Sequence, residues 1–194
     1  MATFTRAQLE ATRDAVLPDI LPDGPLKLLF VGINPGLWTT AAQAPFARPG
    51  NRFWPALAAA GITSHVVDAS GGLSVTDRAD LLERGIGFTN IVPRTTARAD
   101  ELTREELRAG GESLRTLVRA RRPSVVAVLG VTAYRAAFGV SVKQGRQPEP
   151  FEGAELWVLG NPSGLNAHET VASLAMTYGA AAREAGVLPE SAAL

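Results

Sequence analysis

Four short, mostly apolar runs separated by helical patterns constrain the fold of this chain most strongly. The runs lie at residues 27–31, 86–92, 124–130 and 155–159. The first contains Leu28-Leu29-Phe30-Val31, which is continuously apolar rather than alternating, as is typical of a strand covered on both faces in a parallel sheet. Strands that alternate with helices predict a parallel sheet with helices on both faces. We therefore expect an α/β fold, and since no internal repeat or linker divides the chain, one domain over residues 1–194.

Helical patterns lie between and beside these runs. They cover residues 7–17, 51–61, 77–84, 103–122, 132–138 and 167–185. Thr103 and Glu106 have the capping-box spacing that opens a helix, and Asn166 with Glu169 has the same spacing before the last helix. These pairs predict where two of the helices begin.

Two loops are expected between the periodic segments. Residues 37–50 have neither a helical nor a strand period, and loops of this length inside a compact domain are usually functional or disordered. Trp38 and Phe46 argue against disorder, because aromatic side chains are costly to leave exposed without a purpose. Residues 144–153, with two prolines and two glycines, predict a loop or hairpin.

The residue inventory excludes several kinds of site. The chain has no cysteine, which excludes disulfides, thiolate zinc sites, iron–sulfur clusters and cysteine nucleophiles. Its two histidines, His65 and His168, are too few and too far apart for a histidine metal site, and we expect neither a metal nor a cofactor. Nineteen basic and nineteen acidic residues cancel, so the net charge gives no argument for binding nucleic acid.

Three other protein classes lack their characteristic motifs in this sequence. The chain lacks the Gly-Lys pair of a P-loop and the Gly-x-Ser-x-Gly turn of a serine hydrolase. His168-Glu169 begins like a zinc-protease motif, but residue 172 is alanine rather than the second histidine.

No window approaches eighteen apolar residues and residues 1–6 do not begin a signal peptide, so we expect a cytoplasmic protein.

Two Asn-Pro turns follow two of the predicted strands. They are Gly32-Ile33-Asn34-Pro35-Gly36 and Gly160-Asn161-Pro162-Ser163-Gly164-Leu165. Pro35 fixes its own φ and keeps Asn34 out of helical geometry, so the Asn34 amide is presented in a narrow range of directions. Each turn alone could simply end a strand, because Asn, Pro and Gly are common turn residues. Both turns lie at carboxyl ends of parallel strands, however, which meet at the edge where open α/β sheets bind ligands.

Three ordered segments carry a resemblance to a known family. They are residues 32–36, residues 45–54 (Pro-Phe-Ala-Arg-Pro-Gly-Asn-Arg-Phe-Trp) and residues 161–165. Together with residues 89–96, they resemble the mismatch-specific uracil-DNA glycosylase and thymine-DNA glycosylase family, over roughly residues 26–180. The resemblance implies a three-layer α/β/α sandwich around a central, mainly parallel sheet, here of four strands.

The same resemblance implies an activity. It implies a monofunctional glycosylase that flips out and hydrolytically removes uracil, or thymine and other damaged pyrimidines, from mismatched duplex DNA in base-excision repair. The implied partner is double-stranded DNA with a G:U or G:T mismatch, and the expected form is a monomer. The alternative is a non-catalytic or weakly catalytic module that binds DNA or nucleobases on the same fold.

By resemblance, Asn34 positions the attacking water. Cleavage of an N-glycosidic bond builds positive charge on the sugar and negative charge on the leaving base, so a nearby carboxylate would help, and Asn34 cannot ionise. We therefore hypothesise that Asp100 supplements Asn34 as water activator or oxocarbenium stabiliser. Alternatively, Asp100 pairs with Arg98 or Arg94, or caps the helix that begins near Thr103.

The resemblance also assigns substrate contacts. Phe46 stacks on the extruded base, unless it is a loop anchor packed in the core. Asn90 reads the uracil edge, because a carboxamide offers both a donor and an acceptor, complementing N3–H and O4. Alternatively, Asn90 ties down a turn at the end of its strand. The remaining substrate-binding positions are Ile33, Gly36 and Asn161.

Leu165 matches the wedge that fills the place of a flipped base. We expect it at the tip of a DNA-binding loop with Ser163, Gly164 and Asn166. Its alternative role is a hydrophobic staple on Thr170, which is a weak apolar partner.

Two departures from the family pattern stand out. Arg48 replaces a frequent histidine, and we expect it to make a loop contact. Asn166 and Ala167 replace a frequent Ser-Arg pair that helps to read the unpaired guanine, which puts opposite-base selectivity in doubt and favours a broader substrate range.

Overall fold

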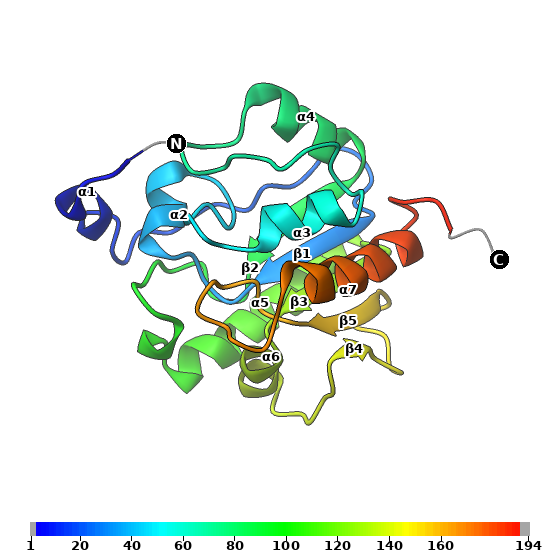
Figure 1. Cartoon of the computed structure of the whole chain (residues 1–194). Coiled ribbons are helices and arrows are strands. Elements are labelled where there is room, and N and C mark those ends of the chain that lie inside the picture. The colour runs from blue at the N-terminus through cyan, green and yellow to red at the C-terminus, as the bar shows by residue number, and fades with distance from the viewer. Residues whose placement is uncertain (1–2, 191–194) are drawn as a thin grey trace.

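The apolar runs form the middle of a five-stranded sheet in the computed structural model, which describes residues 3–190 (Figure 1). In the order in which they lie side by side, the strands are β2 (Ile86–Asn90), β1 (Leu28–Gly32), β3 (Val125–Leu129), β5 (Glu155–Leu159) and β4 (Gly145–Arg146). Neighbouring strands are parallel except for β4, which is antiparallel to β5. The four predicted strands are all present, and the fifth comes from the segment expected to form a loop or hairpin.

Strand β1 lies between β2 and β3, and its five residues are all buried. Its register pairs Phe30 with Phe88 of β2 and with Ala127 of β3. Gly32 is paired with Asn90, so the last residues of these two strands lie side by side at one edge of the sheet. The polar segments that follow β1 and β2 therefore begin next to each other.

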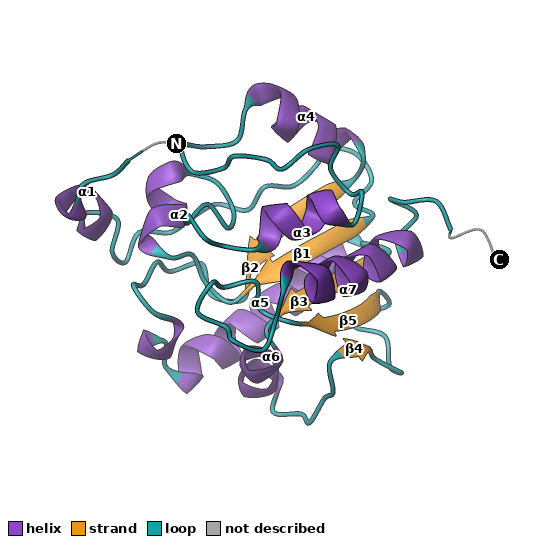
Figure 2. Ribbon diagram, viewed as in Figure 1, coloured by secondary structure: helices purple, strands orange, loops and turns teal. Residues whose placement is uncertain are grey.

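Seven α-helices and one short 3-10 helix surround the sheet within the described residues (Figure 2). They are α1 (Arg6–Glu10), α2 (Leu37–Ala42), α3 (Phe53–Ala59), α4 (Val75–Glu83), η1 (Ala99–Glu101), α5 (Arg104–Arg121), α6 (Val131–Phe138) and α7 (Val171–Glu184). Helices α3 and α7 pack together on one face of the sheet, and α5 and α6 pack together on the other. This arrangement confirms the three-layer α/β/α architecture.

Each face of the sheet has its own apolar core. On the α3 and α7 side, Phe30 makes edge-to-face contact with Phe53 at 5.2 Å between ring centroids and lies 5.8 Å from the ring of Tyr178. On the other side, Leu29 and Val31 pack with the apolar face of α5. Tyr178 also donates a hydrogen bond of 2.9 Å to the carbonyl of Gly160, which ties α7 to the end of β5.

The amino-terminal helix is shorter than predicted. It covers α1 alone, opened by the side chain of Thr5, instead of residues 7–17. Asp14 has a positive φ of 61°, and the chain then runs extended, with Val16 bridged to Arg94 and Ile20 bridged to Phe88. Val16, expected on the face of this helix, is instead paired with the segment that follows β2.

The last helix begins later than predicted. Thr170 caps α7 by accepting a hydrogen bond from the Ser173 N–H, so the expected pair of Asn166 and Glu169 does not form a cap. Glu169 is buried instead, where its carboxylate accepts hydrogen bonds from Gln144 and from the Ser173 hydroxyl. By contrast, the capping box of Thr103 and Glu106 at α5 is confirmed.

Three other boundaries also differ. The predicted loop at residues 37–50 opens with the short helix α2, which ends at Gln43 in the left-handed conformation. Helix α3 starts after Asn51, whose side chain accepts a hydrogen bond from the Phe53 N–H at 2.9 Å. Helix α4 begins at Val75 because the Ser74 side chain caps it.

Candidate active site

A cavity of about 180 Å³ opens at the carboxyl edge of the sheet. The ends of β1 and β2 and the segment after β5 contribute to its wall, together with the loop that precedes α3 and the segment before η1. Of the residues predicted for the site, seven line it: Ile33, Asn34, Gly36, Phe46, Asn90, Asn161 and Ser163. The topology therefore brings together residues that lie up to 130 positions apart, from 33 to 163, in one concave site.

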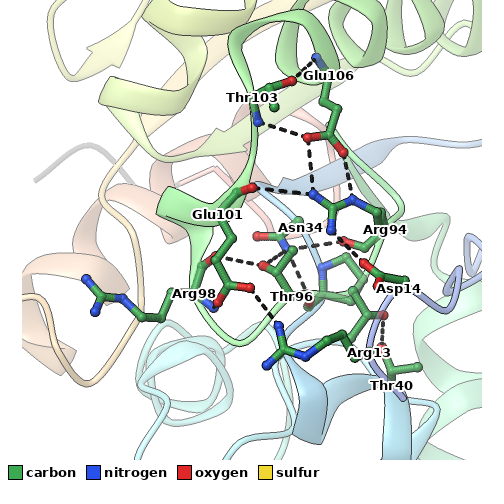
Figure 3. Close-up of polar contacts among 12 residues, drawn as sticks. Arg13, Asp14, Asn34, Thr40, Arg94, Thr96, Arg98, Glu101, Thr103 and Glu106 are labelled. Carbon is green, nitrogen blue, oxygen red and sulfur yellow. Dashed lines mark hydrogen bonds and ion pairs between the residues drawn. The ribbon is translucent and has the colours of Figure 1, made fainter. Parts of the chain in front are cut away.

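The side chain of Asn34 is held in one orientation (Figure 3). Its Nδ2 lies 3.2 Å from the carbonyls of Pro35 and Arg94 and 2.7 Å from the Thr96 Oγ1. The Thr96 hydroxyl in turn donates to the Arg98 carbonyl at 2.7 Å, so it accepts from the Asn34 amide. The Oδ1 of Asn34 has no hydrogen-bond partner among the described residues, and this leaves its acceptor free for a molecule in the cavity.

Arg94 anchors the segment that holds Asn34 (Figure 3). Its guanidinium makes a two-pronged contact with Glu106, with the shorter distance at 2.6 Å, and a 2.7 Å ion pair with Asp14. Hydrogen bonds from Arg94 and from the Thr103 N–H lower the pKa of Glu106 to about 2, and Glu106 and Asp14 raise the pKa of Arg94. The segment that contacts the Asn34 amide is thus held to α5 and to the amino-terminal segment by charge-assisted hydrogen bonds.

Asn90 lies against the backbone of Gly32 at the end of β1. A Cβ added to Gly32 would come within 2.4 Å of the Asn90 Oδ1, so glycine is required for this side chain to lie where it does. The Asn90 side chain makes no hydrogen bond with the residues that the structure describes. The same imaginary Cβ would be 3.5 Å from the Phe46 ring, so Asn90 and Phe46 converge on one spot.

Phe46 both anchors its loop and lines the cavity. Its ring stacks on the buried ring of Phe53, with centroids 4.0 Å apart and planes 24° apart. Its φ of 54° lies in the left-handed region, which is costly for an aromatic residue by about 1–3 kcal/mol. Phe46 is therefore packed against the core, as its alternative role requires. It also lines the cavity.

The segment 161–166 forms a self-bonded loop at the rim. The Asn161 Oδ1 accepts from the Ser163 N–H at 3.0 Å, and the Asn166 Nδ2 donates to the Asn161 carbonyl at 3.0 Å. Leu165 is 79% exposed, so it does not form the staple with Thr170 that was the alternative for this residue. An apolar side chain held in water at the rim is what a wedge requires.

Ile33 and Gly36 shape the floor beside Asn34. Ile33 packs against Gly130, whose absent Cβ would lie 3.1 Å from the Ile33 Cδ1. Gly36 is bridged to Thr96, and the Thr96 N–H donates to the Pro35 carbonyl at 3.2 Å. These contacts hold the first Asn-Pro turn against the segment that follows β2.

Asp100 does not line the cavity. Its carboxylate pairs with Arg98 in η1, and the Asp100 side chain is 64% exposed. The pairing with Arg98 is one of the alternatives that the sequence left open, whereas Glu101, not Asp100, accepts from the Arg98 N–H. A catalytic role for Asp100 stays a prediction.

The role of Thr96 was not predicted from the sequence, and the loop contact expected of Arg48 is not made by a hydrogen bond or ion pair of its side chain among the described residues. Thr96 is 1% exposed and positions the Asn34 amide, but a threonine in a loop gives no sign of such a role. Arg48 lines the cavity and, among the described residues, forms no side-chain hydrogen bond or ion pair. The charged residues on the described cavity wall are Arg48 and Arg98, and Arg98 is paired with Asp100, so Arg48 supplies the uncompensated charge of the described wall.

Within residues 3–190, no group of three or more histidine, aspartate or glutamate side chains could hold a metal ion. No helix in the same range is long and apolar enough to cross a membrane.

The sequence was also compared with models of known protein families. Residues 18–180 match the model of the Uracil DNA glycosylase superfamily. The matched range includes every cavity-lining residue except Leu17.

Proposed function

The chain belongs to the uracil-DNA glycosylase superfamily, whose members are DNA glycosylases, and on that premise we propose that it hydrolyses the bond between uracil and deoxyribose in mismatched duplex DNA. The substrates in this proposal are uracil opposite guanine and thymine opposite guanine, and the departures at Asn166 and Ala167 favour a broad range. The reaction is a hydrolysis by water that leaves an abasic site.

The orientation of Asn34 carries the proposal. Because the amide nitrogen is engaged by Pro35, Arg94 and Thr96, the Oδ1 is left to accept a hydrogen bond from an attacking water. A water that donates one proton to this oxygen has its lone pair directed away from Asn34, toward the C1′ of a bound nucleotide. The C1′–O bond forms as the bond from C1′ to the base breaks, and the electron pair of that bond leaves with the base. The proton that the attacking water loses passes to solvent or to the departing uracil anion.

The cavity supplies recognition of the base. The unpartnered amide of Asn90 offers an N–H donor and a carbonyl acceptor to the edge of uracil. The ring of Phe46, fixed from behind by Phe53, offers a stacking surface beside that amide. A flipped uracil would thus be read by its edge and held by its face.

The charges on the cavity wall favour the leaving base over the sugar. The described wall carries no carboxylate, and its Arg48, which has no ion pair among the described residues, would stabilise a departing uracil anion. The positive charge on the sugar then depends on the phosphates of the DNA. This division of charge predicts a slow enzyme, since Asn34 orients water but cannot accept its proton.

A strand-cleavage assay tests the activity. A duplex with a single uracil opposite guanine is incubated with the full chain and then treated with alkali, which cuts abasic sites. We expect cleavage with the wild type and a loss of about 100-fold or more with Asn34→Ala, because the water is no longer oriented. Binding of the same duplex without any cleavage would instead support the binding-module alternative.

The matched neighbour Thr95 provides a control for this variant. Its buried hydroxyl lies 2.6 Å from that of Thr40 and does not touch the Asn34 amide. Thr95→Val should therefore retain the cleavage rate. Duplexes with uracil opposite adenine and thymine opposite guanine, and a single strand with uracil, define the substrate range in the same assay.

The hypothesis for Asp100 has its own test. The ion pair with Arg98 supports the alternative, structural role, so we expect Asp100→Ala to change the single-turnover rate no more than Asp80→Ala does. Asp80 is a matched control because it is 58% exposed and also pairs with an arginine, Arg84, at 3.5 Å. A clearly larger loss for Asp100→Ala would restore Asp100 as a water activator or charge stabiliser.

A further inference from the structure

Arg52 lies directly before α3 and contacts the loop that follows β5. We name residues 163–166 the wedge loop, because it carries Leu165. The Nη1 of Arg52 donates to the carbonyls of Ser163 at 3.1 Å and Asn166 at 2.8 Å, and its Nη2 donates to that of Gly164 at 3.3 Å. One side chain therefore binds three of the four carbonyls of the wedge loop.

The backbones of the two segments also meet. The Arg52 N–H donates to the Pro162 carbonyl at 2.9 Å, immediately before the wedge loop. A Cβ added to Gly164 would lie 2.6 Å from the Gly50 carbonyl oxygen, so a larger residue would push the loops apart. The wedge loop is thus seated on residues 50–52.

The wedge loop has little apolar packing of its own to fix its shape. Leu165 is largely exposed, and Gly164 has no side chain. The hydrogen bonds inside the loop join neighbouring residues, as in the Leu165 N–H that donates to the Ser163 Oγ at 3.3 Å. A contact from a separate element is therefore needed to set where the loop lies relative to the cavity.

We propose that Arg52 is a positioning residue that holds the wedge loop in the shape that presents Leu165 to the DNA. This inference rests on the proposed function, because a wedge matters only if a base is flipped. Insertion of an apolar side chain into the stack costs a few kcal/mol of unstacking. A loop already ordered before binding avoids an additional entropic cost at that moment.

The planar guanidinium is essential to this role. Its fork of N–H groups reaches carbonyls that lie in different directions, whereas a lysine ammonium is a point charge that cannot hold the same geometry. Arg52→Lys keeps the charge and removes the fork. It therefore separates positioning from simple attraction of a DNA phosphate.

The kinetic test is a double-mutant cycle on the duplex with uracil opposite guanine. We expect Arg52→Lys and Leu165→Ala each to lower the single-turnover rate by about tenfold or more. The double variant should be no slower than the slower single variant, because both changes remove the same wedge. Full activity of Arg52→Lys, or losses that multiply in the double variant, would overturn the proposal.

A matched arginine controls for general damage. Arg84 likewise donates to backbone carbonyls, those of Ile62 and Val187, but lies outside the cavity wall. Arg84→Lys should leave the cleavage rate of the wild type unchanged. Added to Leu165→Ala, it should leave the rate of that variant unchanged as well. Thermal unfolding of each variant shows whether it remains folded at the assay temperature.

Hydrogen exchange separates this inference from the proposed activity. The Asn166 N–H donates to the Ser163 carbonyl at 2.9 Å, and its exchange reports on the order of the wedge loop without any DNA. We expect faster exchange across residues 163–166 in Arg52→Lys and no change in Arg84→Lys. If the wild type releases no uracil, the proposed function fails, while unchanged exchange in Arg52→Lys would by itself refute the positioning role.

Discussion

At the scale of single residues, the orientation of one amide decides what the cavity can do. The Asn34 side chain could present either its N–H groups or its oxygen, and only the oxygen orients a water for attack. Two of the three acceptors that decide this are backbone carbonyls, and the third is the Thr96 hydroxyl. Because that hydroxyl already donates to the Arg98 carbonyl, it must accept from Asn34.

We therefore expect Thr96→Val to slow cleavage by about tenfold to 100-fold with little change in KM, because the Asn34 amide loses its shortest contact. Thr96→Ser should retain most of the rate, since it keeps the hydroxyl. Single-turnover kinetics on the duplex with uracil opposite guanine measure both.

A merely structural role for Thr96 would give a different pattern. Thr95→Val removes a neighbouring buried hydroxyl contact and should cost about 1–3 kcal/mol of unfolding free energy, as Thr96→Val does, because each leaves a buried polar group unpaired. If both valine variants lose the same activity, Thr96 does not act through Asn34.

The same residues show how far a sequence predicts a site. The place of Asn34 in the cavity was predictable because two Asn-Pro turns follow parallel strands whose carboxyl ends meet at one edge of the sheet. Thr96 was not, because its role depends on hydrogen bonds across 62 positions of sequence. Asp100 was proposed because it is a carboxylate in the loop after the second predicted strand. Its side chain pairs with Arg98 instead of lining the cavity, and the sequence pattern does not predict side-chain orientation.

At the scale of elements, strands were predicted more reliably than the ends of helices. A strand buried on both faces, such as β3, needs an unbroken apolar run, which is visible in the sequence. The start of α7 was misplaced because Asn166 and Thr170 are both good caps, and Asn166 instead bonds to Asn161 and Arg52 inside the rim loop. Asn166 therefore stabilises the loop before α7 instead of starting the helix.

Helix α2 shows the opposite difficulty. Its six residues lack an amphipathic period, so the sequence predicted only a loop. It is held by tertiary contacts, among them the Trp38 Nε1 donating to the Ser70 carbonyl at 3.0 Å and the Thr40 hydroxyl meeting that of Thr95. Short helices of this kind depend on packing rather than on local propensity.

At the scale of the whole molecule, arginine side chains join segments that are far apart in the sequence. Arg94 connects the amino-terminal segment at Asp14 with α5 at Glu106. Arg115 and Arg119 of α5 both bind Glu152, each at 2.6 Å, and their hydrogen bonds lower the pKa of Glu152, that from Arg119 most. Helix α5 is therefore fastened by acid-sensitive contacts at both ends.

These contacts predict how stability depends on pH. The pKa of Glu106 is about 2 in the folded chain and near 4.5 when the residue is free in the unfolded chain. A lowered folded pKa contributes stability that is fully present above pH 4.5 and is lost as the pH falls from 4.5 toward 2, where the folded carboxylate takes up its proton. We expect the urea midpoint to fall over this window, with Glu152 adding a change of the same sign.

Glu106→Gln isolates the contribution of the charge. Glutamine is also suited to the third position of a capping box, so it can still bond to the Thr103 N–H while losing the negative charge that pairs with Arg94. The variant should be less stable than the wild type at pH 7, and the difference should shrink toward pH 3 in urea unfolding. If the difference in stability stays constant with pH, packing rather than the ion pair makes Glu106 important. If the difference shrinks at low pH, the ion pair with Arg94 is responsible, and the acid sensitivity then belongs to the segment that holds Asn34.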